Sequence, residues 1–198
     1  MPRQPQLETC VKTLGQAFDM AKVSPPGRLA LRRVFDRLAG PAGKAAATVP
    51  AEALPVTALY DQALAPLLTR ADALTPLANA LATLTPDLRW TTRKSVGPTA
   101  SPGFAQAHAN AVLIGPGGVE HHDAVWIGLS LLAPHTRYPD HDHAPEEVYL
   151  MLSQGAFRQG DADWQPHTAG DTVYNSPGIR HAMRAGDLPF LALWCLPL

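Results

Sequence analysis

The chain has 198 residues, a formal net charge of −1 and 46% hydrophobic residues. This length is sufficient for one domain with a substantial apolar core. A charge near zero, without a basic block, argues against nucleic acid or an anionic membrane as a partner. No apolar run is long enough to cross a bilayer.

The N-terminal part of the chain has the apolar spacing of helices. Helices are predicted over residues 7–18, 29–38, 55–70 and 71–84. Residues 24–27 (SPPG) mark a break, residues 40–50 a linker, and Pro66 and Pro76 are points where a helix kinks or restarts. Residues 1–88 are therefore predicted to form a helical segment, which serves either as a lid or as a structural cap.

The second part of the chain has a different pattern. From residue 89 onward, short apolar or alternating runs are separated by Gly, Pro, Asn and Asp. Strands are predicted over residues 111–114, 124–132, 148–152, 172–174 and 190–194. Short strands at this spacing favour a barrel or a sandwich. The expected fold is thus mainly β with an α-helical N-terminal half, and residues 89–198 are expected to carry the functional site.

The segment 138–149 (YPDHDHAPEEVY) places potential metal ligands at odd-numbered positions. His141, His143, Glu147 and Tyr149 would share one face of an extended strand, because side chains on a strand alternate between faces. Imidazole and carboxylate together suit zinc, iron(II), manganese or nickel, whereas calcium and magnesium sites are normally built from oxygen. One divalent transition metal is therefore predicted here.

A further ligand is expected from His181, which follows the Pro-Gly turn at 177–178. A short alternating segment after such a turn can bring one histidine back over the first pair. A lone histidine is usually structural, but a His-x-His-x-x-x-Glu pattern with a distant histidine is far more specific. The alternative is that residues 140–143 form only a polar hydrated loop.

These two segments resemble the two motifs of the cupin superfamily. The matching residues are His141, His143, Glu147 and Gly155 in the first motif, and Gly170, Pro177, Gly178 and His181 in the second. The spacing before Gly155 is one residue longer than usual, His181 comes one residue early, and no Asn closes the second motif. The resemblance implies a cupin antiparallel β-barrel, while the reaction has to be argued from the site.

A narrower resemblance extends over Tyr138 and the segments 147–153 (EVYLMLS), 181–184 (HAMR) and 191–195 (LALWC). Together they resemble the cupin-type dimethylsulfoniopropionate lyases of marine bacteria. This resemblance implies β-elimination to dimethyl sulfide and acrylate. It implies that His143, Glu147 and His181 are metal ligands, that His141 is a ligand or a close neighbour, and that Tyr149 or Tyr138 is the catalytic base.

The residue types suit an elimination on their own. The proton is removed from a carbon next to a carboxylate, and a nearby cation stabilises the developing negative charge. A tyrosine, whose reference pKa is about 10, becomes a useful base when a dication lies close. Tyr149, two residues from Glu147, is placed to respond to the ion.

Other side chains are candidates for substrate contacts. A positive sulfonium could lie against aromatic faces, and the candidates are Trp194, Trp126, Trp164 and Tyr174. An aromatic residue in an apolar run is, however, more often part of the barrel core. Arg137, beside Tyr138, is the candidate for binding an anionic substrate.

Three functions remain open from the sequence. The first is a metal-dependent dimethylsulfoniopropionate lyase; the second is another metal-dependent cupin enzyme, such as a dioxygenase or a lyase or isomerase acting on a related carboxylate. The third is a non-catalytic ligand-sensing cupin. A small-molecule substrate is the expected partner, and the helical segment could also serve as a dimerisation arm in a homodimer. Cys10 and Cys195 lie far apart, so no disulfide framework is expected and the cytoplasm is the expected location.

Overall fold

The computed structural model describes residues 2–45, 54–93 and 97–198. Its helices are α1 (Pro5–Met20), α2 (Pro25–Leu38), α3 (Tyr60–Leu68), α4 (Leu74–Thr83) and α5 (Phe104–Ala107), with 3-10 turns η1 (Pro55–Leu59) and η2 (Thr85–Asp87). The four predicted helices are therefore confirmed, with shifted ends. Residues 46–50 of the predicted linker lie outside the described residues.

The prolines explain where the helices begin. Ser24 caps α2 by accepting a hydrogen bond from the Gly27 backbone nitrogen at 3.3 Å. The two prolines that follow occupy the first turn of α2, where no backbone N–H is needed. The segment predicted as a break is thus the start of α2. Pro76 likewise lies in the first turn of α4, whereas Pro66 lies inside α3.

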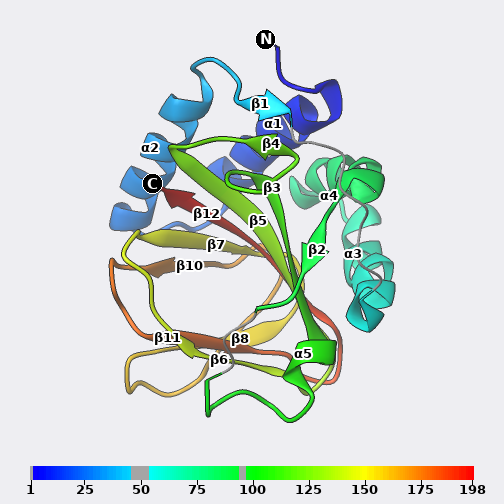
Figure 1. Ribbon diagram of the computed structural model, residues 1–198, viewed down its shortest axis with the longest axis vertical. Helices are drawn as coiled ribbons and strands as arrows, with labels where there is room; N and C mark the ends of the chain where they lie inside the picture. Colours follow the sequence, from blue (N-terminus) through cyan, green and yellow to red (C-terminus); the bar gives the residue numbers. More distant parts are fainter. Residues whose placement is uncertain (1, 46–53, 94–96) are drawn as a thin grey trace.

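The strands form two sheets. They are β1 (Lys44–Ala45), β2 (Trp90–Thr91), β3 (His108–Ile114), β4 (Glu120–His121), β5 (Val125–Leu132), β6 (Arg137–His141), β7 (Glu147–Met151), β8 (Gly155–Gln159), β9 (Gln165–His167), β10 (Thr172–Asn175), β11 (His181–Arg184) and β12 (Phe190–Pro197). The large sheet has the order β1-β4-β3-β5-β12-β7-β10, with β2 paired to β3, and the small sheet has the order β6-β11-β8-β9. The two sheets face each other (Figure 1), and the predicted fold, mainly β with an α-helical N-terminal half, is confirmed.

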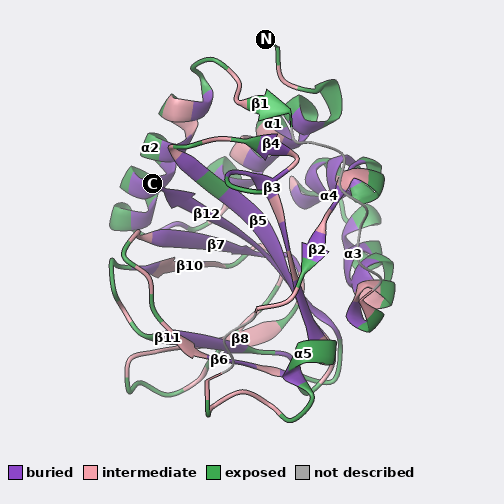
Figure 2. Cartoon of the chain, in the orientation of Figure 1, coloured by how far each residue is buried: buried purple, intermediate pink, exposed green. Residues whose placement is uncertain are grey.

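Strands β5, β7 and β12 of the large sheet each contribute to two apolar clusters. On β12, Leu191, Leu193 and Cys195 pack with the N-terminal helices, whereas Phe190 and Trp194 point between the two sheets. This is the alternation expected for a strand that is buried on both faces. Figure 2 shows the result: β5, β7 and β12 are buried along most of their length.

The helical segment covers the outer face of the large sheet. Helix α2 packs on β12 and β7, and α1 packs on α4. The helices and the sheet share one core, so the helical segment stabilises the barrel directly. A division into two domains near residue 88 stays a prediction. Among the described helices, none combines the length and the apolar character needed to span a membrane.

Arg3 links the start of the chain to the barrel. Its Nε donates to Glu120 Oε2 at 2.8 Å and its Nη2 donates to Oε1 at 3.2 Å, with both side chains almost fully buried. We expect Arg3→Met to lower the free energy of unfolding by about 3 kcal/mol, because it leaves a buried carboxylate without its partner.

Urea unfolding measures this loss. Arg70→Met is the matched control, because Arg70 pairs with Asp72 at an exposed position; it should change the free energy of unfolding by less than about 1 kcal/mol. Equal losses in the two variants would show that burial of the Arg3 pair is irrelevant to stability.

Candidate metal centre

Four side chains meet between the two sheets. His141 is the last residue of β6, His143 lies in the connection that follows, Glu147 is the first residue of β7, and His181 is the first residue of β11. Strand β6 belongs to the small sheet and β7 to the large sheet. The expectation that His141 to Tyr149 run along one strand is therefore wrong, although the side chains do converge.

The connection between β6 and β7 does not continue as a strand, because it contains a proline. Pro145 has no backbone N–H to donate to a sheet ladder, so a continuous strand is unfavourable there. The Gly178 nitrogen donates to the His143 carbonyl at 2.9 Å and holds this connection against the second motif. Gly178 has φ +69°, a conformation that favours glycine. His181 and His141 are direct partners in the β6–β11 ladder.

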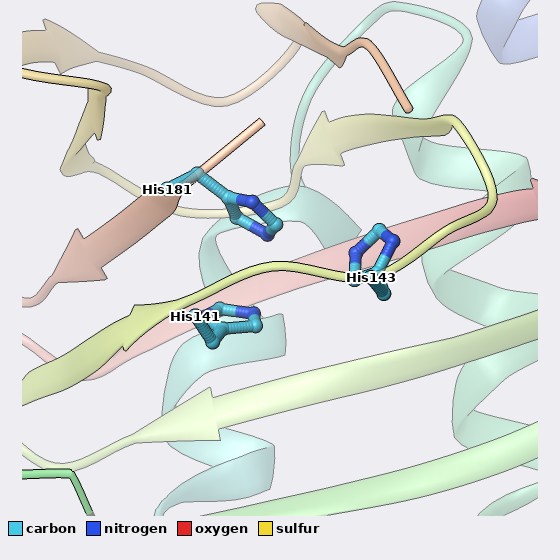
Figure 3. Close-up of side chains that lie close together, drawn as sticks. All are labelled: His141, His143 and His181. Carbon is cyan, nitrogen blue, oxygen red and sulfur yellow. The ribbon is translucent and has the colours of Figure 1, made fainter. Parts of the chain in front are cut away.

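The three imidazoles are oriented by the backbone. The Nδ1 atoms of His141, His143 and His181 lie 2.9, 2.8 and 3.0 Å from the carbonyl oxygens of Pro139, Pro145 and Ile179. A neutral imidazole that donates from Nδ1 keeps a lone pair on Nε2. One ring nitrogen of each histidine lies within 4.8 Å of those of the others. Figure 3 shows the rings turned towards one another.

Glu147 adds a buried carboxylate to this cluster. Its Oε2 lies 3.2 Å from His143 Nε2 and 3.4 Å from His181 Nε2. Asn175 Nδ2 donates to the same oxygen at 3.0 Å, and Gln159 Nε2 donates to Asn175 Oδ1 at 2.6 Å. Although burial by itself raises the pKa of Glu147, the imidazoles of His143 and His181 lower it to about 2. The two amides carry no signal in the sequence that could have identified them.

The donor set fits a divalent transition metal. Among the described residues, His181 Nε2 is buried and has no hydrogen-bond partner, which is costly for a polar atom unless another group satisfies it. The pKa of His141 is lowered to about 4, first by burial and then by His181. Neutral imidazole nitrogens beside an ionised carboxylate are the ligands that such ions prefer.

A cavity of about 370 Å³ opens beside this cluster. Its lining includes the sequence-predicted residues Tyr138, His141, His143, Glu147, Tyr149, Trp126 and Trp194, and also Thr91, Thr92, Arg93, Asn110, Val112, Ser130 and Leu196. None of these comes from the described part of residues 1–88, whose helix α2 packs on the large sheet. The lid and the structural cap both stay predictions.

Comparison with known proteins identifies the family of this chain. The family model described as dimethylsulfoniopropionate lyase matches residues 27–192. A Cereibacter sphaeroides protein, DddL, that carries the name of a dimethylsulfoniopropionate lyase is 34% identical over 168 residues, covering 83% of this chain and 69% of that protein. The chain belongs to the dimethylsulfoniopropionate lyase family. The resemblance seen at residues 138–153 and 181–195 is thereby confirmed.

Two comparisons involve DddQ of Ruegeria pomeroyi, named as a dimethylsulfoniopropionate lyase. Its sequence is 32% identical over 91 residues, which cover 46% of this chain and 45% of that protein. Its crystal structure superposes with a TM-score of 0.72 at 22% identity, covering 98% of this chain and 92% of the other. The fold is therefore shared over almost the whole length.

The two tyrosines of this family member have different neighbours. Tyr138 accepts a hydrogen bond from Asn110 Nδ2 at 3.3 Å, and its ring centre lies 4.9 Å from that of His141. Tyr149 is buried, and burial together with Glu147 raises its pKa well above the ordinary value. Both line the cavity, so each is placed to reach a bound molecule.

Trp126 and Trp194 form an aromatic wall of the cavity. The rings of Trp126 and Trp194 meet edge to face with centres 5.5 Å apart. Trp194 Nε1 donates to Ser130 Oγ at 3.1 Å, and Ser130 Oγ donates to Asn110 Oδ1 at 2.7 Å. Asn110, which the sequence did not single out, thus connects the aromatic wall to Tyr138.

Three of the predicted substrate contacts lie elsewhere in this family member. Arg137 donates to Asp140 at 2.8 Å, and its guanidinium lies over Trp164, with 5.4 Å from Cζ to the ring centre. Tyr174 donates to Glu146 at 3.0 Å. The structure does not bring Arg137, Trp164 or Tyr174 to the cavity lining.

Gly128 makes room for the indole of Trp194. A Cβ at this position would overlap the Trp194 ring and approach the Ala111 carbonyl oxygen to 2.5 Å. We expect Gly128→Ala to destabilise the protein by about 1–3 kcal/mol, because the ring has to move out of a packed position. Thermal unfolding measures the loss. Gly186→Ala is the control, since a Cβ there meets nothing within 4 Å; equal melting temperatures for the two variants would contradict this role.

Proposed function

We propose that this chain is a metal-dependent lyase that converts dimethylsulfoniopropionate to dimethyl sulfide and acrylate by β-elimination. We infer this reaction from the family of the chain and from the names of its relatives. One observation supports it most: two tyrosines and an imidazole–carboxylate cluster line a single cavity that also has an aromatic wall. The base, the cation site and the apolar surface that the reaction needs are therefore all within reach of one bound molecule.

His141, His143, Glu147 and His181 would hold the metal. Zinc, iron(II), manganese and nickel all suit this donor set. When bound, such an ion supplies a Lewis acid that stabilises negative charge on the substrate carboxylate. The backbone carbonyls that accept from the Nδ1 atoms keep the ring nitrogens aimed at the centre.

The aromatic wall suits the cationic end of the substrate. A sulfonium group is attracted to the faces of aromatic rings and repelled by other cations. Trp126 and Trp194 present apolar surface to the cavity. Held there, the sulfonium would lie near Tyr149, which is the direct partner of Trp194 in the β7–β12 ladder.

Tyr138 is the better candidate for the base. Its oxygen accepts from Asn110, so the amide stabilises negative charge on that oxygen. Tyr149 is buried beside Glu147, which would itself be a metal ligand. We therefore assign proton removal to Tyr138 and a place next to the metal ligands to Tyr149.

The elimination balances with these groups alone. Tyr138, acting as the phenolate, takes the proton from the carbon next to the carboxylate, and that C–H electron pair becomes the new carbon–carbon double bond. The carbon–sulfur bond breaks with its electron pair moving to sulfur, which leaves as neutral dimethyl sulfide. Acrylate remains, and Tyr138 returns its proton to water.

Headspace gas chromatography tests this function. Purified protein, stripped with a chelator and reloaded with each of the four metals, is given dimethylsulfoniopropionate. We expect dimethyl sulfide release to vanish on stripping and to return with at least one metal. No release with any metal, from protein that circular dichroism shows to be folded, would refute the lyase. Substrate-dependent oxygen consumption would instead support a dioxygenase.

A further inference from the structure

Arg93 stands out among the residues that the sequence did not predict. It lies two residues beyond the end of β2 and lines the cavity, where its Cζ lies 5.7 Å from the centre of the Tyr138 ring. Of the described arginines, Arg93 alone contributes to this lining. A guanidinium at a cavity wall brings a permanent positive charge to that wall, and its five N–H groups can serve more than one partner at a time.

A buried histidine holds Arg93 in place. The Arg93 backbone nitrogen donates to His108 Nε2 at 2.8 Å. His108 Nδ1 lies 2.6 Å from the Phe104 carbonyl oxygen, and its ring stacks on Phe104 with centres 3.6 Å apart. Burial, as the first cause, lowers the pKa of His108, so the ring stays neutral and can accept from Arg93.

His108 provides a hydrogen bond to the Arg93 backbone that the β2–β3 ladder does not provide. Strand β2 ends at Thr91, so the ladder with β3 stops before Arg93. His108, at the first position of β3, is completely buried and plays no part in the proposed elimination. Its hydrogen bond extends the attachment of this segment to β3 by two residues beyond the ladder.

The cavity has two chemically different regions. One is cationic, at Arg93 near Tyr138, and the other is aromatic, at Trp126 and Trp194.

We propose that Arg93 binds the carboxylate end of the substrate and that His108 is the positioning residue for Arg93. The inference rests on the proposed function for the identity of the substrate and extends it to how the substrate is oriented. A zwitterion with one carboxylate and one sulfonium would enter with the carboxylate towards Arg93, because a guanidinium attracts carboxylates in a paired geometry and repels sulfonium.

We call this role of Arg93, as the binding group for the substrate carboxylate, the anchor. Binding of each half of the substrate tests it. The probes are acrylate, which has only the carboxylate, and trimethylsulfonium, which has only the cationic end, both titrated by calorimetry into the metal-loaded protein. We expect Arg93→Met to weaken acrylate binding by roughly tenfold or more, as loss of a charge-assisted hydrogen bond does. Trimethylsulfonium binding should stay the same or become tighter, and Arg93→Lys should weaken acrylate binding less than Arg93→Met.

Arg89→Met is the matched control. Arg89 lies in the same segment, but its guanidinium donates to the carbonyl oxygens of Pro86 and Leu88, outside the cavity. It should leave the affinity for both probes unchanged. If Arg93→Met lowers kcat while acrylate affinity stays at the wild-type value, Arg93 acts on Tyr138 and not on the carboxylate, and the anchor is overturned.

A double-mutant cycle tests His108. We expect His108→Phe to weaken acrylate binding in the wild type and to have no further effect in Arg93→Met, because it acts through Arg93. His108→Gln, which keeps an acceptor for the Arg93 nitrogen, should restore part of the affinity. Additive losses would overturn the positioning role.

The anchor and the proposed function fail separately. If the protein binds acrylate through Arg93 but releases no dimethyl sulfide, the reaction is refuted and the anchor stands. If dimethyl sulfide is released and Arg93→Met leaves acrylate affinity unchanged, the anchor is refuted and the reaction stands.

Discussion

Replacing His181 with Asn is expected to abolish tight metal binding and to lower dimethyl sulfide release by about a hundredfold or more. Loss of a mere neighbour of a metal ligand already costs roughly 10–100-fold, and His181 presents its Nε2 directly to the cluster. Elemental analysis of the purified variant gives the metal content, and headspace chromatography gives the rate.

His135→Asn is the control for this substitution. His135 is exposed and has φ +58°, a conformation that asparagine tolerates well. It should keep the full metal content and rate. A His181→Asn protein that holds one metal per chain and turns over normally would remove His181 from the ligand set.

Tyr138→Phe is expected to lower kcat by roughly 10²–10⁴-fold, the usual contribution of a general base. Metal content should not change, because the three histidines and the glutamate that would hold the metal all remain. Affinity for acrylate should also be retained, since the ring still fills its place beside His141. Steady-state kinetics and calorimetry on the same preparations measure these three properties.

Tyr149→Phe and Tyr174→Phe serve as the comparison and the control for Tyr138→Phe. Tyr149→Phe should reduce kcat less than Tyr138→Phe if Tyr149 serves next to the metal ligands and not as the base. Tyr174→Phe should leave turnover intact, because Tyr174 binds Glu146 outside the cavity. A larger loss of kcat in Tyr149→Phe than in Tyr138→Phe would reverse the assignment of the base.

Local sequence patterns were sufficient for most of the secondary structure. Apolar spacing predicted α1 and α2, and alternating or apolar runs predicted β5, β7 and β12. The error at residues 24–27 arose because a serine followed by two prolines both ends one segment and caps the next helix. Such local rules identify elements well and their first residues less well.

The metal-ligand residues could be selected from the sequence by their chemistry. His141, His143, Glu147 and His181 are the types that bind a transition metal, and their spacing is unusual enough to be noticed. Their arrangement, in contrast, depends on two sheets facing each other, with Glu147 on one and His141 and His181 on the other. The amides of Asn175 and Gln159 become relevant only once β8 and β10 are placed beside this carboxylate.

The choice of the cavity arginine shows why tertiary structure was needed. Arg137 is adjacent to Tyr138 in sequence, but neighbouring residues on a strand point to opposite faces, so Arg137 lies outside on Trp164. Arg93 reaches the same tyrosine from a distant segment, through the pairing of β2 with β3 and the hydrogen bond to His108. Residue types and their spacing were enough to identify which side chains could bind a metal and which segments could form the strands. Only the packing of distant strands decided which of them share the cavity, because that depends on contacts that no local pattern contains.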